Sequence, residues 1–370
     1  MILSSIHLKN FRKHTELSLN FSNKINYLIG NNGIGKTTVL EAIYYLSTTR
    51  GYKTKSDAEL ITFEEKQLAV EGVFTNQNEQ NARIYYDKEG NGKNYFLNGK
   101  RLSRNIEIIG KFPTVLLTPE DHAITQGQPA NRRRLVDSTI SQANRLYLET
   151  LIDYNKTLRQ RSFLLHKIKE RRSKQLIDEL DAWTTKLVES GIQLINHRKV
   201  FITEFNDYIS SSYTDIIETK EKPKITYSYL DDYNGENIRE RFEELLKEKQ
   251  EEEIRRTTNL VGPHREDYIF ELNGYLLRYY GSQGQHKTFQ IALKYSQYLY
   301  LKEKIGEEPI FLLDDVFGEL DTSRAVKISN LLGHAGQTFI TVTDFSNLNF
   351  ISRNDNDSFI RMSEKETVYA

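Results

Sequence analysis

One eight-residue segment limits the possible folds of this chain more than any other. Residues 30–37 are Gly-Asn-Asn-Gly-Ile-Gly-Lys-Thr and match the pattern G-x-x-x-x-G-K-[ST]. Glycines at these places allow backbone N–H groups to surround phosphate oxygens, and the N-terminus of a following helix adds a positive dipole. The apolar run 25–29 precedes the segment and a helical pattern begins at Lys36. The context therefore predicts a strand, a phosphate-binding loop and a helix, which is typical of α/β nucleotide-binding folds.

The loop supplies candidate contacts for ATP and for Mg²⁺. Lys36 is expected to reach the β- and γ-phosphates, and the Thr37 hydroxyl is expected to ligate the metal. The alternative, a glycine-rich turn with an incidental lysine, does not account for the flanking strand and helix patterns. The other candidate nucleotide-binding residues of this segment are Gly30, Asn31, Asn32, Gly33, Ile34, Gly35 and Thr38.

Two adjacent acids complete the predicted site. The apolar run 310–313 ends in Asp314 and Asp315. On a strand beside the loop, Asp314 would lie on the metal side and Asp315 could orient or activate the attacking water. The predicted catalytic residues are thus Asp315 and Lys36, and the predicted metal ligands are Thr37 and Asp314.

The periodicity of apolar residues divides the chain into three segments. Residues 1–120 and 256–370 alternate strand-like and helical patterns, whereas 121–255 is dominated by helical periodicity. Apolar residues recur at helical spacing over 147–168 and again over 177–205, with the polar break 171–174 between them, which favours an antiparallel helical hairpin. We therefore predict an α/β ATPase domain built from the N-terminal segment 1–120 and the C-terminal segment 256–370, with a helical insertion at 121–255.

A third motif, Ser282-Gln283-Gly284-Gln285, opens a predicted helix. A serine hydroxyl and glycine amides at a helix N-terminus can form a phosphate-binding surface, although a polar turn with an N-capping serine is the simpler alternative. The segment resembles the signature motif of ABC-type ATPases, which faces the γ-phosphate of ATP held by another subunit. The resemblance makes Ser282, Gly284 and Gln285 candidate ATP contacts, and it implies a homodimer joined by ATP.

Other motifs of that class are only partly present. Residues 318–321 resemble the D-loop, whereas Thr343 stands where the switch histidine is expected. No Q-loop residue is assigned, because Gln126 and Gln128 come only after the segment 118–121.

Several motifs along the chain occur together in one known family. They are Lys9-Asn10-Phe11-Arg12, residues 30–37, Thr118-Pro119-Glu120-Asp121, Arg132-Arg133-Arg134, Val261-Gly262-Pro263-His264-Arg265, Ser282-Gln283-Gly284-Gln285 and Leu313-Asp314-Asp315-Val316. By these motifs nearly the whole chain resembles the bacterial replication and repair ATPases of the ABC/SMC-Rad50-like family. This resemblance implies an ABC-type head with a helical insertion, slow DNA-stimulated ATP hydrolysis, sequence-independent binding of single-stranded or gapped DNA, and recombinase loading with RecR and RecO during the response to DNA damage.

The distribution of charge indicates where DNA could bind. Basic and acidic residues balance at 51 each, but residues 156–174 hold eight basic residues against Glu170 alone. This basic run and Arg132-Arg133-Arg134 could each neutralise phosphates. A solvated helix face and ion pairs inside the fold are the respective alternatives. His264 and Arg265 could be catalytic or structural.

Composition excludes several classes of protein. The chain has no cysteine, so it has no disulfide framework, thiolate zinc site or cysteine nucleophile. It has no apolar run near the roughly 18 residues of a membrane span and no signal-like start, so a cytoplasmic location without a membrane partner is expected. The alternatives that remain are a transporter ATPase subunit, which needs a membrane partner, and an SMC-like chromosome protein, which needs much longer arms.

Overall fold

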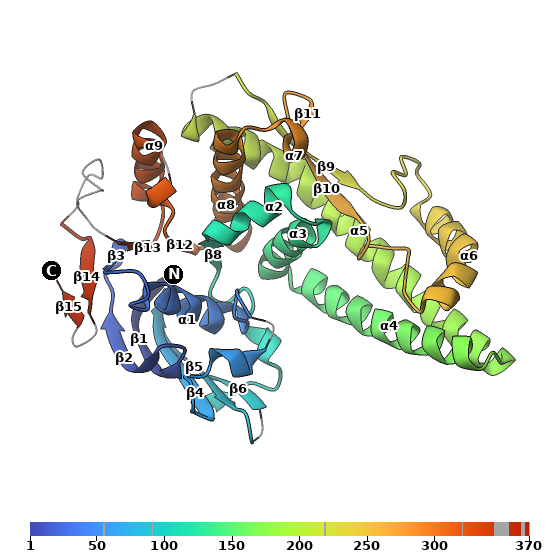
Figure 1. The fold of residues 1–370 in the computed structure, drawn as a ribbon, viewed down its shortest axis with the longest axis horizontal. Coiled ribbons are helices and arrows are strands. Elements are labelled where there is room, and N and C mark those ends of the chain that lie inside the picture. Colours follow the sequence, from blue (N-terminus) through green and yellow to red (C-terminus); the bar gives the residue numbers. More distant parts are fainter. Residues whose placement is uncertain are drawn as a thin grey trace. The chain divides into compact units, whose positions relative to one another are not determined.

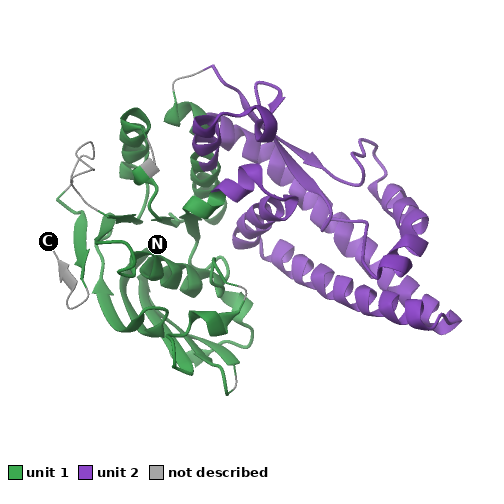
Figure 2. Cartoon of the chain, in the orientation of Figure 1, with its two compact units in different colours: residues 1–121, 212–219, 291–370 green, residues 122–211, 220–290 purple. Residues whose placement is uncertain are grey.

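The computed structural model describes residues 1–54, 56–90, 92–217, 220–319, 321–343, 355–363 and 367–369 (Figure 1). The chain divides into two compact units, which are coloured separately in Figure 2. Unit 1 comprises 1–121, 212–219 and 291–370, and unit 2 comprises 122–211 and 220–290.

The described residues of unit 1 form two six-stranded sheets. One is antiparallel, in the order β2-β1-β4-β5-β6-β7. The other, in the order β15-β14-β3-β13-β12-β8, is parallel except for β15. The strands are β1 (Ile2–Phe11), β2 (His14–Asn20), β3 (Ile25–Ile29), β4 (Gln67–Thr75), β5 (Glu79–Asp87), β6 (Gly92–Leu97), β7 (Lys100–Arg101), β8 (Thr114–Leu117), β12 (Ile310–Leu313), β13 (Thr338–Val342), β14 (Ser358–Met362) and β15 (Thr367–Tyr369).

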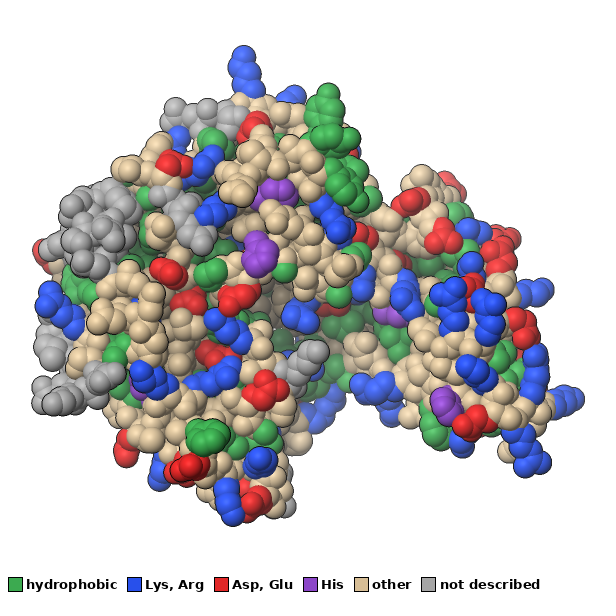
Figure 3. Space-filling model, viewed as in Figure 1, with side chains coloured by type: hydrophobic (Ala, Val, Ile, Leu, Met, Phe, Trp, Pro, Cys, Tyr) green, Lys and Arg blue, Asp and Glu red, His purple; other side chains and the backbone are tan. Residues whose placement is uncertain are grey.

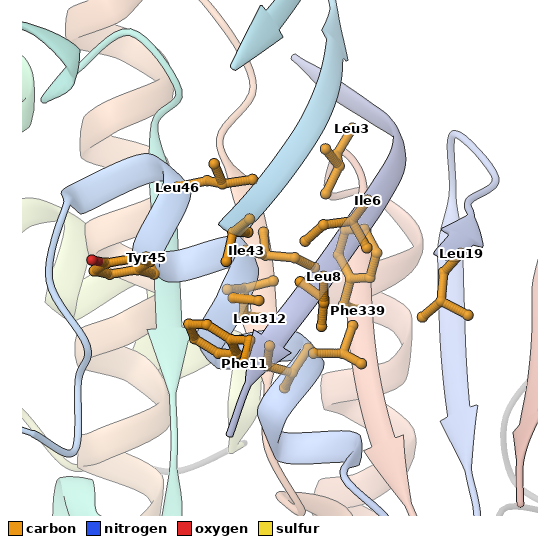
Figure 4. Packing of buried hydrophobic residues seen from close by; sticks show 14 of the residues in the cluster. Leu3, Ile6, Leu8, Phe11, Leu19, Ile43, Tyr45, Leu46, Leu312 and Phe339 are labelled. Atoms are coloured by element: carbon orange, nitrogen blue, oxygen red, sulfur yellow. The ribbon is translucent and has the colours of Figure 1, made fainter. Parts of the chain in front are cut away.

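Helix α1 (Lys36–Thr48) lies in the hydrophobic core of unit 1. Its residues Ile43 and Leu46 are fully buried, in one cluster with Leu8 of β1, Leu312 of β12 and Phe339 of β13 (Figure 4). The helix thus packs with strands of both sheets, which fixes the position of the loop that precedes it. The predicted strand at 25–29, the helix from Lys36 and the strands at 310–313 and 338–342 are confirmed.

Unit 2 is built around a helical hairpin. Helices α4 (Arg145–Glu170) and α5 (Lys174–Ile216) run antiparallel, because Thr150 contacts Gln193 and Arg161 contacts Thr184. This confirms the predicted hairpin and its break near 171–174. The other helices of this unit are α2 (His122–Gln126), α3 (Pro129–Ala143), α6 (Ile238–Arg256) and α7 (Leu277–Tyr280). Helix α8 (Gln283–Ile305) starts in unit 2 and ends in unit 1, whose remaining helices are η1 (Asp57–Leu60), η2 (Asn105–Ile108), η3 (Pro119–Asp121), η4 (Phe317–Glu319) and α9 (Thr322–Gly333).

The division of the chain differs from the predicted one at its second boundary. The insertion extends to residue 290 rather than 255, and residues 212–219 belong to unit 1. The physical reason is a small antiparallel sheet in unit 2, in the order β11-β10-β9. Strand β10 (Asp267–Leu272) pairs with β9 (Pro223–Ser228) and with β11 (Tyr275–Leu276), so the strand-like residues after 266 join the insertion.

Buried ion pairs hold the helices of unit 2 together. Arg161 is 2 % exposed and donates to Glu253 of α6, which is fully buried, at 2.8 Å. Arg198 of α5 is equally buried and donates to Asp137 of α3 at 2.7 Å and to Glu266 at 3.2 Å. Burial of an arginine is tolerated only with such partners, because the desolvation of an unpaired charge costs several kcal/mol.

Candidate nucleotide-binding site

Strand β3 and helix α1 hold the glycine-rich segment as a tight loop. Gly33 and Gly35 have φ angles of 80° and 107°, a left-handed backbone that residues with a Cβ adopt only under strain. Gly35 is also the N-cap of α1, so the turn delivers the chain directly into the helix. The loop therefore has the strand, turn and helix context that the sequence predicts.

Lys36 lies against the loop itself. Its Nζ donates to the carbonyl oxygen of Gly30 at 2.5 Å and to that of Asn31 at 3.0 Å. Burial lowers the pKa of Lys36, whereas the carboxylates of Asp315 and Asp314 oppose that shift. The ammonium group is thus placed at the loop, where phosphate oxygens can replace the two carbonyls as acceptors.

Asp314 and Thr37 meet beneath the loop, as the sequence predicts. The Thr37 hydroxyl donates to Asp314 Oδ1 at 2.7 Å, and the Thr341 hydroxyl donates to the same oxygen at 2.9 Å. Tyr52 donates to Asp314 Oδ2 at 3.4 Å, and Asp314 is only 3 % exposed. The cluster arises because β12 and β13 run parallel to β3 and bring their carboxyl ends to one edge of the sheet. Its hydroxyl and carboxylate oxygens are the donor type that Mg²⁺ prefers.

Asp315 differs from its neighbour in exposure and in backbone conformation. It is exposed, and its φ of 49° is unusual for a residue other than glycine. Its backbone N–H donates to the Thr341 hydroxyl at 2.8 Å, which holds the strained turn in place. Backbone strain of this kind concentrates at functional sites, and here it directs one carboxylate inward and the next to solvent.

The turn between β1 and β2 clamps the loop from the side. Arg12 donates to both oxygens of Glu41 in α1 at 2.9 and 3.2 Å, Lys13 donates to the carbonyl of Gly33, and His14 contacts the carbonyl of Gly35 at 3.3 Å. Burial lowers the pKa of His14, so its ring is neutral at pH 7. Lys13 also lines an open cavity of about 610 Å³ at the loop, whose other lining residues are Asn31, Asn32, Gly33, Ile34, Met362 and Ser363.

Four residues that contact the loop or Asp314 are not predicted from the sequence: Lys13, His14, Tyr52 and Thr341. Only two of them stand close enough to a predicted motif for the sequence to have indicated them. Lys13 directly follows the Lys9–Arg12 motif, and Thr341 stands two residues before Thr343, the position considered for the switch. Thr343 itself is exposed just beyond β13, and the neighbouring Asp344 is outside the described residues.

The Ser282 segment caps α8 in unit 2. The Ser282 hydroxyl accepts from the Gln285 N–H at 3.2 Å, and the Gln285 side chain accepts from the Ser282 N–H at 2.8 Å. Gln285 also donates to Glu221 at 2.6 Å. These reciprocal bonds form a capping box, and Ser282 is exposed at the start of the helix. The simpler alternative, an N-capping serine, is therefore present, and it leaves the serine O–H able to donate to a ligand.

His264 and Arg265 have structural contacts inside unit 2. The His264 Nδ1 lies 2.8 Å from the Tyr154 hydroxyl, and its Nε2 lies 3.1 Å from the carbonyl oxygen of Asn259. Burial lowers the pKa of His264 to about 4, so the ring is neutral at pH 7. Arg265 donates to the same Asn259 carbonyl at 3.0 Å. Both side chains stabilise the turn at 259–265.

The three consecutive arginines of α3 do not form one basic surface. Arg132 is buried and donates to both oxygens of Asp267 at 2.7 and 2.9 Å. Arg133 donates to the carbonyl oxygen of Glu266, and only Arg134 is exposed. Two of the three side chains are thus used within the fold, and the alternative of an internal ion pair holds for Arg132.

Comparison with known proteins identifies the family. The sequence model described as the RecF/RecN/SMC N-terminal domain matches residues 2–367. The DNA replication and repair protein RecF of Chloroherpeton thalassium is 39 % identical over 357 residues, which cover 93 % of this chain and 95 % of the relative. The chain belongs to the RecF family. RecF of Salinibacter ruber is 38 % identical over 351 residues, which cover 93 % of this chain and 85 % of that relative.

Solved structures agree with this assignment. A RecF structure described as RecF-ATPrS in the RecFOR pathway has a TM-score of 0.90 and 33 % identity, with 100 % of this chain and 98 % of that chain covered. A RecF-ATP structure has a TM-score of 0.89 and 34 % identity, with 100 % and 97 % covered. An Smc head at 12 % identity and a TM-score of 0.56 shares the fold. The chain is thus an ATPase of the RecF/SMC type, which favours the DNA-repair interpretation over a transporter subunit. None of the helices in the described ranges is long and apolar enough to cross a membrane.

Proposed function

We propose that this chain binds Mg²⁺-ATP at residues 30–38 of unit 1 and hydrolyses it slowly, as a switch for binding DNA. The observation that carries this proposal is the contact of Thr37 and Thr341 with Asp314 directly beneath the glycine-rich loop. When bound there, Mg²⁺ would be held by Thr37 and Asp314 and would neutralise phosphate charge.

The side chains of the site have different chemical roles. Lys36 exchanges its two carbonyl acceptors for oxygens of the β- and γ-phosphates. Asp315, exposed beside the buried Asp314, orients the attacking water and accepts its proton as the general base. The Arg12, Lys13 and His14 contacts keep the loop and α1 in place while the phosphates change.

Asp315→Asn is expected to separate binding from turnover. The amide is similar in size but cannot take the proton of water, so ATP affinity should stay within about threefold while the hydrolysis rate falls by roughly 10²–10⁴-fold. Release of phosphate under single-turnover conditions measures the rate, and a fluorescent ATP analogue measures affinity. Hydrolysis at the wild-type rate would place the catalytic base elsewhere.

We also propose that ATP joins two copies of the chain. The Ser282 hydroxyl lies at the start of α8, a helix of 23 residues whose N-terminus carries a positive dipole. The bonds between Gln285, Ser282 and Glu221 hold this end rigid. Ser282, Gly284 and Gln285 would then contact the γ-phosphate of ATP bound to the second copy, which makes the homodimer dependent on ATP.

We propose that DNA binds to the exposed basic side chains near the C-terminal end of α4. These side chains contact phosphates and do not read the base sequence. Most of the basic run is exposed, with Lys and Arg side chains visible along this region of unit 2 in Figure 3. Arg161 is the exception, because it is buried against Glu253. RecR and RecO are the expected protein partners at gaps and junctions, because the solved relatives are described as mediators in the RecFOR pathway. The exposed members of the run are Lys156, Arg159, Lys167, Lys169, Arg171, Arg172 and Lys174.

Neutralising three residues of this surface is expected to weaken DNA binding for all base sequences alike. We expect Lys167→Gln/Lys169→Gln/Arg171→Gln to flatten the slope of log affinity against log salt by roughly 0.7–0.9 for each phosphate that is no longer neutralised. Because the three side chains are exposed, the thermal midpoint should change little. Lys24→Gln, which removes an exposed lysine of unit 1, is the control. An unaltered affinity and salt slope would move the DNA site away from α4.

A further inference from the structure

Large side chains gather on the surface of unit 2 just before the Ser282 segment. Tyr275, Tyr279 and Tyr280 are 65, 71 and 72 % exposed, and Leu276 is 38 % exposed. They come from β11 and α7, and in Figure 3 hydrophobic side chains project as a green ridge at that place. We call these four residues the tyrosine ridge. Contiguous exposed surfaces of this kind mark interaction sites.

The backbone holds the ridge in a fixed shape. Leu277, in the middle of the segment, is 1 % exposed and anchors the single turn of α7 in the core. The N–H of Gly281 donates to the Leu277 carbonyl at 2.9 Å and closes that turn. The rings of Tyr275 and Tyr280 meet edge to face with centroids 5.9 Å apart. The contact between these two rings restricts their motion, which lowers the entropic cost of binding.

Positive charge borders the ridge. Lys224 of β9 is exposed, and the backbone of Lys222 bonds to Asn273 at the hairpin that leads into β11. Arg278 is exposed and lies over the ring of Tyr279, with its guanidinium carbon 5.7 Å from the ring centroid.

Two acids of the same region already have partners. Glu271 lies opposite both Lys224 and Leu276 in the sheet and accepts from Thr226, and Glu221 accepts from Gln285.

We propose that the tyrosine ridge binds single-stranded DNA, with unpaired bases stacked on its rings and phosphates held by the flanking cations. Stacking on exposed rings needs a free base face, which a duplex hides and a single strand offers. A second copy of the chain is the competing occupant, because the Ser282 segment directly follows the ridge, and the test below separates the two. The inference deepens the proposed function, because it names the form of DNA that unit 2 takes.

The test compares two DNA probes with the full chain. Fluorescence anisotropy with a labelled oligothymidine and with a labelled duplex of equal length measures both affinities. We expect Tyr279→Ala/Tyr280→Ala to weaken binding of oligothymidine by about tenfold or more and to change duplex binding by less than about twofold. Tyr279→Phe/Tyr280→Phe keeps the rings and should keep the affinity. Phe63→Ala removes an aromatic ring of unit 1 that is 89 % exposed and serves as the matched control.

Several results would overturn the inference. Unchanged affinity of the alanine variant for oligothymidine, or an equal loss for both probes, would remove base stacking from this surface. A weakened ATP-dependent dimer with unchanged DNA affinity would assign the ridge to a second copy instead. Failure of the wild-type chain to bind either probe would contradict the DNA-binding role in the proposed function as well, whereas an effect of the α4 variant without one of the ridge variant contradicts only this inference.

Discussion

Replacing Lys36 with alanine is expected to abolish ATP binding at micromolar concentrations. The lysine donates to Gly30 and Asn31 at the centre of the loop, where the β- and γ-phosphates are expected. A charged hydrogen bond contributes about 1.5–3 kcal/mol. Loss of the contacts to two phosphates should therefore lower ATP affinity by at least about a hundredfold. Titration with a fluorescent ATP analogue measures the loss.

The control for this variant is Lys24→Ala, which removes an exposed lysine of the same unit. It should bind ATP as the wild-type chain does. Because the Lys36 ammonium bonds, within the described part of the chain, only to two backbone carbonyls of the loop, and Asn31 lines the open cavity, Lys36→Ala should keep a thermal midpoint within a few degrees of wild type. Wild-type affinity in a folded Lys36→Ala variant would contradict the assignment of the phosphate site.

Arg161→Met is expected to destabilise unit 2 by about 3–5 kcal/mol, because it leaves the fully buried carboxylate of Glu253 without its cation. The arginine also bonds to Thr184 and Asn259, so one substitution releases contacts to three other segments. The corresponding fall in thermal midpoint is on the order of 10 °C. Calorimetry of the full chain measures it.

Two comparison variants separate the buried charge from general loss of an arginine. Arg159→Met removes an exposed arginine of the same helix and should leave the midpoint nearly unchanged. Adding Glu253→Gln to Arg161→Met removes the uncompensated charge and should restore some of the lost stability. If the double variant is no more stable than Arg161→Met, packing rather than charge dominates at this position.

The nucleotide site could be predicted from the sequence because each of its motifs is a short continuous segment of the chain. The loop at 30–37 has a strand before it and a helix after it, and Asp314 ends an apolar strand. Each element also has a propensity that agrees with its final state. One feature depends on residues far apart in the chain, namely the pairing of β12 and β13 beside β3. It brings Asp314 to the loop because the carboxyl ends of parallel strands meet at one edge of the sheet.

The features that escaped prediction depend on partners far away in the chain. Arg161 interrupts an apolar series, a pattern typical of an exposed residue. It is buried instead because it pairs with Glu253, 92 positions later in the chain. The strand at 267–272 has no local mark to show that β9 is its partner. Tyr279 and Tyr280 carry no local mark of exposure in the sequence, and they face solvent because Leu277 between β11 and Gly281 is buried.

Sedimentation velocity of Ser282→Arg, alone and mixed with Lys36→Ala, tests most directly the claim that ATP joins the loop of one copy to Ser282 of another. With Mg²⁺-ATP the wild-type chain should sediment as a dimer. Ser282→Arg should bind ATP but remain monomeric, because its new side chain occupies the place of the other copy's γ-phosphate. Mixing it with Lys36→Ala permits one intact site per pair and should give a weak dimer. A normal ATP-dependent dimer of Ser282→Arg alone would contradict the account.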